Sequence, residues 1–294
     1  MRVPVLALAL VALLPATTQA KQRLFFDAVY TRTSTSGPGD DMVGHVQTGS
    51  GVLRDAATHK VGQFAFTWRW IEILSDGDAR ERCTGHGTTA DGRLNVSGPS
   101  LRNALTHTWS VDGGTGRYRK AHGKVVVRDL EQTGDTLVAI AVTPRRRTTL
   151  RAGAIPNAAA NTAFRRLADA RCDDAAKAIA ALPPFPFTEF DPLNPDPAVL
   201  PDVGRFFTGP HDPRPALQQL QEELTALSRP PAQRTTWARL VAAHAAALPL
   251  IQRQDDAALA ADVAGFVQGV KESSQNFRDI AVNATIFGTT DCII

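Results

Sequence analysis

Two different hydrophobic periods divide this chain. Over residues 21 to about 150, apolar and polar side chains alternate in short runs such as Phe64–Trp70, and glycine-rich turns separate the runs. A period of two predicts β-strands with one buried face. The run Thr136–Thr143 is mostly apolar, which is typical of a strand buried on both faces. Seven or eight short strands at this spacing indicate a sandwich or a closed barrel.

From Asn157 onward the apolar residues recur at helical spacing. The expected helices are Asn157–Leu182, Arg214–Ser228, Ala232–Gln252 and Asp255–Thr285. Along the last of these, apolar residues follow one another at steps of three, four or seven, which marks one apolar helical face. Its acidic start suits a helix N-terminus, and Gly288 suits its exit.

A proline-rich segment, residues 183–215, connects the first two helices and holds ten of the 19 prolines. Proline fixes φ and removes a backbone donor, so this segment is expected to be extended or turned. Its five phenylalanines are too many for a free linker, and we expect an ordered loop laid over the helices.

The first twenty residues predict an export signal. Arg2 precedes the apolar run Val3–Ala16, and Thr18 and Ala20 place small residues where a signal peptidase reads, so cleavage is expected before Lys21. The run is shorter than the roughly 20 residues that a membrane span needs. We therefore expect a secreted, periplasmic or cell-envelope protein that is soluble after cleavage and has no stable membrane insertion.

Export would place the three cysteines in an oxidising compartment, where one bridge can form within a monomer. Cys172 and Cys292 both lie in the helical half, whereas Cys83 lies among the strands. We predict a Cys172–Cys292 disulfide and a free thiol at Cys83. No two cysteines form a C-x-x-C pair, so a cysteine metal site is not expected.

The most specific motif lies in Val111–Gly123. It resembles the G-G-T-G-x-Y/F-x-x-A-x-G signature of allene oxide cyclase-like and dirigent-like barrels, and Cys83–Gly87 with the following Asp91-Gly92 is similar to their bacterial secreted branch. The matching residues are Gly113, Gly114, Thr115, Gly116, Tyr118, Ala121 and Gly123. Physically, the motif describes a turn at positive φ, an aromatic plug and a close approach of strands. The resemblance covers about residues 24–143.

The change of hydrophobic period, together with the resemblance of the first half, indicates a multi-domain α and β protein. An antiparallel eight-stranded β-barrel, calycin- or allene oxide cyclase-like, would occupy about residues 22–150, followed by a linker at 151–156 and a disulfide-closed helical bundle at 157–294. The barrel interior would be hydrophobic and open at one end. Barrels of this family cyclise or isomerise reactive hydrophobic intermediates or steer radical coupling, and holding one conformer away from water accounts for much of such catalysis. The family's catalytic carboxylate has no counterpart that can be aligned here.

Candidate site residues come from strand faces. Alternation places Phe66, Trp68, Trp70 and Glu72 on one face, and a carboxylate beside an aromatic wall would suit acid–base chemistry, so Glu72 is the catalytic candidate. The alternative is that Glu72 lies at the solvated end of its strand.

Further ligand-binding candidates come from two other runs. Arg82 and His86 share one strand face, and His107 and Trp109 share another, so together they could hold an anionic group at the barrel mouth. The alternative is an exterior polar face, which every half-exposed strand has. Tyr118 and the tryptophans are either packed core or a ligand wall.

Charge and spacing exclude several classes of function. A net charge of +3, with no basic tract beyond Arg145–Arg147, does not suit a dedicated nucleic-acid binder. The histidines show no H-x-H or H-E-x-x-H spacing, and the glycine motif lacks the Lys-Ser/Thr of a phosphate loop. Neither a metal nor a cofactor is expected.

Two classes of function remain. The first is an exported barrel that binds a small hydrophobic ligand, with or without cyclase- or isomerase-like activity by conformational templating. The second is a non-catalytic envelope scaffold with a filled barrel, whose helical domain binds a protein partner. A cavity of a few hundred cubic ångströms with one or two buried polar groups would favour the first, and solid packing would favour the second.

Overall fold

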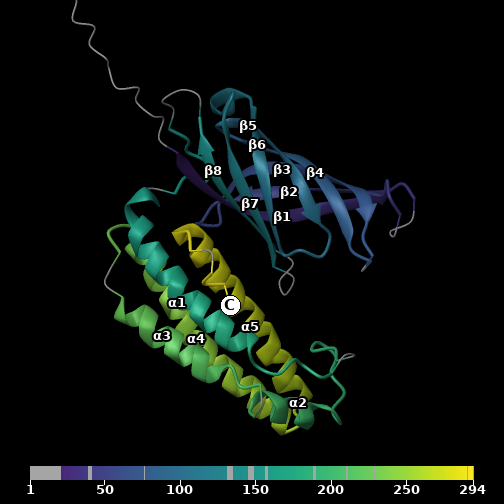
Figure 1. Ribbon diagram of the computed structural model, residues 1–294, viewed down its shortest axis with the longest axis vertical. Helices are drawn as coiled ribbons and strands as arrows, with labels where there is room; N and C mark the ends of the chain where they lie inside the picture. The colour runs from purple at the N-terminus through teal and green to yellow at the C-terminus, as the bar shows by residue number, and fades with distance from the viewer. Residues whose placement is uncertain are drawn as a thin grey trace, which may run out of the picture.

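The computed structural model describes residues 21–38, 42–75, 77–130, 135–144, 149–155, 158–187, 190–209, 211–227, 230–289 and 291–293. The expected export signal, residues 1–20, lies outside these ranges. Strands occupy the first half of the described chain and helices the second, and the helices lie together on one side of the strands (Figure 1).

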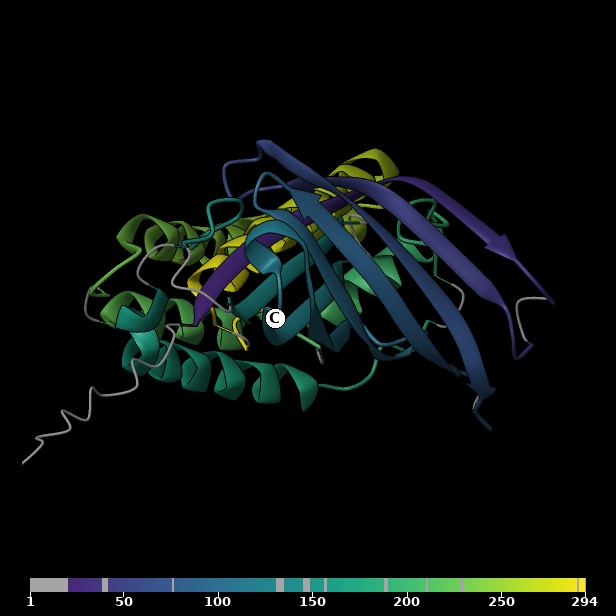
Figure 2. The same ribbon diagram turned by 90° about the horizontal axis from the view of Figure 1, so that it is seen from above.

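The strands close into a barrel. They are β1 Gln22–Ser36, β2 Val46–Arg54, β3 Lys60–Ile73, β4 Ala79–Thr89, β5 Gly92–Leu101, β6 Thr106–Gly114, β7 His122–Leu130 and β8 Asp135–Thr143. Each pairs antiparallel with the next, and β8 pairs back with β1, which confirms the expected eight-stranded antiparallel barrel. Seen from above, the strands cross the helices obliquely (Figure 2).

The glycine motif packs one end of the barrel. Gly113, Gly114 and Gly116 have φ values of 91°, 157° and 58°, which side chains rarely adopt, so the turn requires glycine. After Thr115, the short 3₁₀-helix η1 (Gly116–Tyr118) turns Tyr118 inward, where its side chain is 1% exposed. Further along the motif, Ala121 is also buried, and a Cβ on Gly123 would lie 2.1 Å from the Ala141 carbonyl oxygen. The motif therefore acts as a packed plug, as the sequence suggests.

The segment after β8, part of which was expected to be a linker, packs on the barrel over residues 149–155. Leu150 and Ala152 belong to the barrel core. The backbone N–H groups of Arg151 and Ala152 donate to Oδ2 of buried Asp91, at 2.7 and 2.8 Å. Buried carboxylates hold backbone donors strongly because the acceptor is charged. Residues 149–155 are therefore fixed to the same end that Tyr118 plugs.

Five helices form the second half of the described chain: α1 Thr162–Ala180, α2 Leu200–Phe207, α3 Arg214–Ala226, α4 Arg234–Leu259 and α5 Val263–Phe287. A disulfide joins Cys172 of α1 to Cys292 beyond α5, as predicted, and Cys83 is a buried free thiol in the barrel. Among the described residues, no helix combines the length and apolar character that a membrane crossing requires.

Two expectations for the helices are wrong in detail. The helix that begins at Arg234 continues through Pro249 to Leu259, so Asp255 lies inside α4 and does not begin α5. The break comes at Asp262, whose side chain accepts a hydrogen bond from the Gly265 N–H at 3.0 Å. Gly288 ends α5 in the left-handed conformation, as expected.

The proline-rich connection is structured, but it contains a helix where an extended or turned chain was expected. Pro201 lies in the first turn of α2, where the missing N–H costs no helical hydrogen bond. Phe185, which precedes α2, contacts Phe206 and Phe207 at the end of α2, and Phe190 contacts Phe266 of α5 with ring centroids 5.9 Å apart.

α5 covers the outer face of β1 and β8. Phe25 and Leu137 form a buried cluster with Ala281 and other α5 residues. Beside this cluster, Arg278 Nη2 donates to Asp27 Oδ2 at 2.6 Å. Inward residues of β8 belong to the barrel core at the same time, so this apolar strand is buried on both faces, as its composition predicts.

Candidate functional site

Among the residues that the structure describes, the barrel has a cavity at one end. At the end opposite Tyr118, side chains line an open cavity of about 250 Å³. Its lining residues are Tyr30, Thr33, Gln47, Trp68, Glu81, Arg102, His107 and Asp129. Towards the plugged end, apolar side chains leave a void of only about 30 Å³. The candidate site is therefore the open half, which we call the mouth cavity.

A hydrogen-bonded series of side chains forms one wall of the mouth cavity. His107 Nε2 lies 3.3 Å from Asp129 Oδ2, and Thr136 Oγ1 donates to Asp129 Oδ1 at 2.6 Å. The Tyr30 hydroxyl lies beside Thr136 and the Asp129 charge, and burial raises the pKa of Tyr30. Tyr30 is therefore a neutral hydrogen-bond donor, while Asp129 orients the imidazole of His107.

Close backbone approach places the Tyr30 ring. A Cβ on Gly49, across from β1, would lie 2.6 Å from Tyr30 Cε1, so only glycine leaves room for the ring to lie against β2. The ring meets Phe64 edge-on at 5.0 Å and lies 6.4 Å from Trp68. A bulge in β1 follows Tyr30, and Thr33 beyond it also lines the cavity.

Glu81 supplies a buried carboxyl group. Its side chain points inward from β4 and is 5% exposed. Burial raises the pKa of Glu81, and the nearby Trp70 side chain and the His107 and Arg102 charges oppose this shift without cancelling it. A carboxyl group with a raised pKa keeps its proton nearer to neutral pH and can donate it.

Arg102 lies at the rim, in the turn between β5 and β6. Its guanidinium lies 5.0 Å from the centre of the Trp70 ring, and its Nη2 donates to the Gly77 carbonyl at 2.7 Å. His45 lies against the same Trp70 ring at 4.2 Å. Trp70 is therefore covered by His45 and Arg102 and supports the rim from below.

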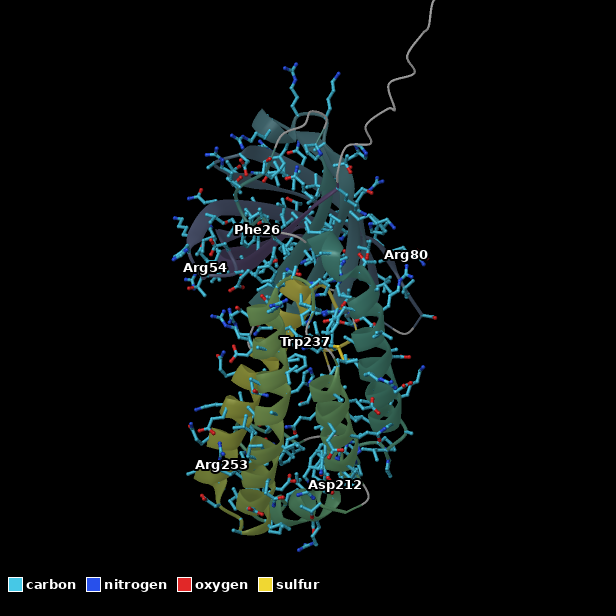
Figure 3. The ribbon with its side chains drawn as sticks, turned by 90° about the vertical axis from the view of Figure 1, so that its left-hand side faces the viewer. Phe26, Arg54, Arg80, Asp212, Trp237 and Arg253 are labelled. Carbon is cyan, nitrogen blue, oxygen red and sulfur yellow. A yellow bond between two sulfur atoms is a disulfide. The ribbon has the colours of Figure 1, made fainter. Side chains whose placement is uncertain are left out.

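Glu72, the expected catalytic residue, lies outside the barrel. Trp70 pairs with Glu81, but Glu72 pairs with Arg80, so Ile71 is an extra residue in a β-bulge. The bulge reverses the alternation and turns Glu72 to solvent, where its Oε2 lies 2.5 Å from Arg80 Nη1. Figure 3 shows Arg80 projecting from the outer surface. The solvated alternative for Glu72 is thus correct.

Arg82 and His86 also lie on the outer face of β4. Arg82 is exposed, and His86 Nδ1 lies 3.1 Å from Arg93 Nη2, with its pKa lowered by partial burial and by that cation. Their inward neighbours are Glu81 and Cys83, because side chains alternate along the strand. The structure therefore separates Arg82 and His86 from the mouth cavity.

The remaining candidates lie inside the barrel at different depths. Trp68 and His107 line the mouth cavity. Trp109 lies below them, stacked on His107 at 6.0 Å, and its indole N–H donates to Ser100 Oγ at 3.1 Å. Phe66 and Tyr118 line the small void near the plug. Of the expected ligand-binding set, only Trp68 and His107 contact the mouth cavity.

The sequence interpretation missed Tyr30, Glu81, Arg102 and Asp129. Alternation could have found three of them: Tyr30 continues the inward series Phe26 and Ala28, Asp129 follows two inward valines, and Glu81 precedes inward Cys83. Arg102 lies in a turn, where no periodicity applies.

Cys83 is buried among the inward side chains. Burial raises the pKa of its thiol, which keeps it protonated and weakly nucleophilic. Within the described ranges, no group of three or more histidine, cysteine, aspartate or glutamate side chains is arranged to hold a metal ion.

Comparisons with known proteins give a likeness of fold alone. Neither family models nor curated proteins match the chain. Pyocyanin demethylase is similar over 41% of this chain and 99% of its own, at 19% identity and a TM-score of 0.38. The Diels-Alderase AbmU from Streptomyces koyangensis matches 42% of this chain and 61% of its own, at 14% identity and a TM-score of 0.35. A pterocarpan synthase dirigent protein matches 43% and 88%, at 17% identity and a TM-score of 0.35.

Proposed function

We propose that the barrel binds a small molecule in the mouth cavity and promotes its isomerisation or cyclisation without a cofactor. The observation that carries the proposal is the half-hollow interior, with a cavity of about 250 Å³ whose buried polar groups converge from different strands. Trp68 and Tyr30 offer aromatic surface, while Glu81 and Tyr30 offer hydrogen-bond donors. The fitting ligand has an unsaturated apolar body and a carbonyl-type oxygen.

The side chains support a proton-transfer mechanism. Glu81 donates its proton to the carbonyl oxygen, while His107 removes a proton from the adjacent carbon, which forms an enol. In neutral His107, Nε2–H donates to Asp129, so Nδ1 is the proton acceptor. Return of the carbon proton to a different carbon and of the hydroxyl proton to Glu81 completes the isomerisation and restores both groups.

Enclosure supplies the second contribution. A flexible substrate held against Trp68 and Tyr30 retains one conformer, and water is excluded from its reacting part. The same effect would favour ring closure of a linear unsaturated molecule. The packed half of the barrel is what a filled scaffold predicts, whereas the hollow half favours ligand binding.

We also propose that the protein works after export. The Cys172–Cys292 disulfide supports this location, because such bonds persist in oxidising compartments.

Binding is tested on full-length protein purified from its own host by native mass spectrometry. We expect the wild type to carry a small molecule, and Trp68→Ala to lower its occupancy at least about tenfold, because the variant loses an aromatic wall. Arg82→Ala, on the outer face of the same sheet, is the matched control and should keep the ligand. A wild type without ligand, or equal occupancy in Trp68→Ala, contradicts the binding proposal.

Chemistry is tested with cyclohex-3-enone, whose conversion to the conjugated ketone is followed by ultraviolet absorbance. Glu81→Gln is expected to lower kcat about 100-fold with little change in KM, because the amide keeps the shape and a donor but cannot transfer a proton. Arg82→Gln, one residue away and outward, should retain wild-type kcat. Equal rates for Glu81→Gln and wild type would remove Glu81 from the mechanism.

A further inference from the structure

The core of the helical half is interrupted by a second cavity. One cluster packs around Trp237, Phe164 and the disulfide, and a separate cluster packs around Phe266 and α2. Between them lies a cavity of about 280 Å³, bounded by α1, α3, α4 and α5. Its wall is mainly aliphatic, with Leu217, Leu250, Ile251 and Ile280 among its members. We call it the bundle cavity.

A buried histidine forms part of the wall of the bundle cavity. His244 lies on α4, is 3% exposed, and its Nε2 has no hydrogen-bond partner among the described residues. The ring is hydrogen-bonded to the Cys292 backbone carbonyl. Because Nε2 has no partner, the donor of this bond is Nδ1–H. In that tautomer Nε2 is an acceptor with a free lone pair. A buried polar atom without a partner is costly, so its position calls for an explanation.

Two other polar side chains of the bundle cavity each make a hydrogen bond within the helical half. Asn276 Nδ2 donates to the Ala243 carbonyl at 3.1 Å, and Ser273 Oγ donates to Gln254 Oε1 at 3.1 Å. Among the described residues that line the cavity, none is a lysine, arginine, aspartate or glutamate. Burial lowers the pKa of His244 to about 4, so the ring is neutral near neutral pH.

We infer that the bundle cavity binds a small neutral apolar molecule carrying one O–H or N–H donor, which it directs at Nε2 of His244. The aliphatic wall selects an uncharged body, and the buried, unpartnered Nε2 of His244 selects a hydrogen-bond donor. An alkylphenol or a medium-chain alcohol has this chemistry. The site is separate from the mouth cavity and does not depend on its function.

The test measures binding of 4-propylphenol and of propylbenzene to the full-length, disulfide-bonded protein by isothermal titration calorimetry. These probes differ by one hydroxyl group. We expect the wild type to prefer the phenol about tenfold, the effect of one well-made hydrogen bond to a buried acceptor. His244→Leu should retain propylbenzene binding and reduce the preference to less than about twofold.

Two further variants locate the site. Ala247→Leu, which fills the bundle cavity and keeps His244, is expected to weaken both probes at least about tenfold. Trp68→Ala, in the mouth cavity, should leave the preference unchanged. The inference is wrong if the wild type binds neither probe or binds both alike, if the preference survives in His244→Leu, or if Trp68→Ala abolishes it.

Discussion

Replacing Cys172 and Cys292 together by alanine is expected to lower the free energy of unfolding by about 5 kcal/mol. The two residues are 120 positions apart, and closing so long a loop removes much conformational freedom from the unfolded chain. The bond also holds the chain end beside α1, within the cluster around Phe164 and Trp237. Urea titration followed by helical circular dichroism measures the loss.

Cys83→Ala is the matched control, because it removes a buried sulfur and leaves the bridge. Its expected cost is about 1 kcal/mol, the value of one small buried apolar group. In denatured, unreduced wild-type protein, thiol titration should find one free thiol per chain, at Cys83. Three free thiols, or equal stability of the double variant and the wild type, would contradict the prediction.

Acid is expected to destabilise the fold through His244. Its pKa is about 4 in the folded chain, below the ordinary value of 6.5, because burial disfavours the charged ring. The unfolded chain therefore takes up the proton first as the pH falls. Stability is fully present above about pH 6.5 and declines until about pH 4, by about 3 kcal/mol. As the pH falls over this range, the free energy of unfolding of His244→Leu should therefore rise by about 3 kcal/mol relative to that of the wild type.

Asp255, on the same helix, acts in the opposite direction. Burial raises its pKa from 3.8 to about 6; Asp212 and Asp256 add to the shift, and Arg214, with Nη1 at 3.7 Å from Oδ2, opposes it. The folded chain therefore binds this proton more tightly than the unfolded chain. Its contribution is present below about pH 3.8 and is lost as the pH rises through about 6, with a change of about 3 kcal/mol.

The two effects are separated by urea titrations between about pH 4 and pH 7. As the pH falls, the stability of Asp255→Asn relative to the wild type should decrease, whereas that of His244→Leu should increase. Parallel pH profiles for wild type and both variants would show that neither buried group titrates as described.

The arrangement of strands and helices follows from local patterns. Period-two runs predict the strands, and the glycine motif predicts how the chain closes one end. The run Thr136–Thr143 predicts a doubly buried strand, and Leu137 on its outer face is indeed covered by α5. These features are predictable because each depends on residues that are neighbours in sequence.

The site was less predictable because single-residue irregularities decide it. One extra residue, Ile71, turns Glu72 outward, whereas Glu81 on the neighbouring strand points its carboxyl group into the mouth cavity. The periodicity of the sequence does not predict such a bulge. The predicted start of α5 was wrong for a similar reason, because the acidic pair at Asp255 resembles a helix N-terminus. The chain actually breaks between α4 and α5 at Ala261, which has a φ of 54°, and at Asp262.

The plug around Tyr118 has a kinetic consequence for the mouth cavity. Since one end of the barrel is packed, any molecule that reaches Glu81 and His107 must arrive and depart by the Arg102 rim. Two compounds of similar size then exclude each other, and no ternary complex forms. Inhibition by a reaction product would accordingly be competitive with substrate, and changes at the rim would alter association and dissociation rates together.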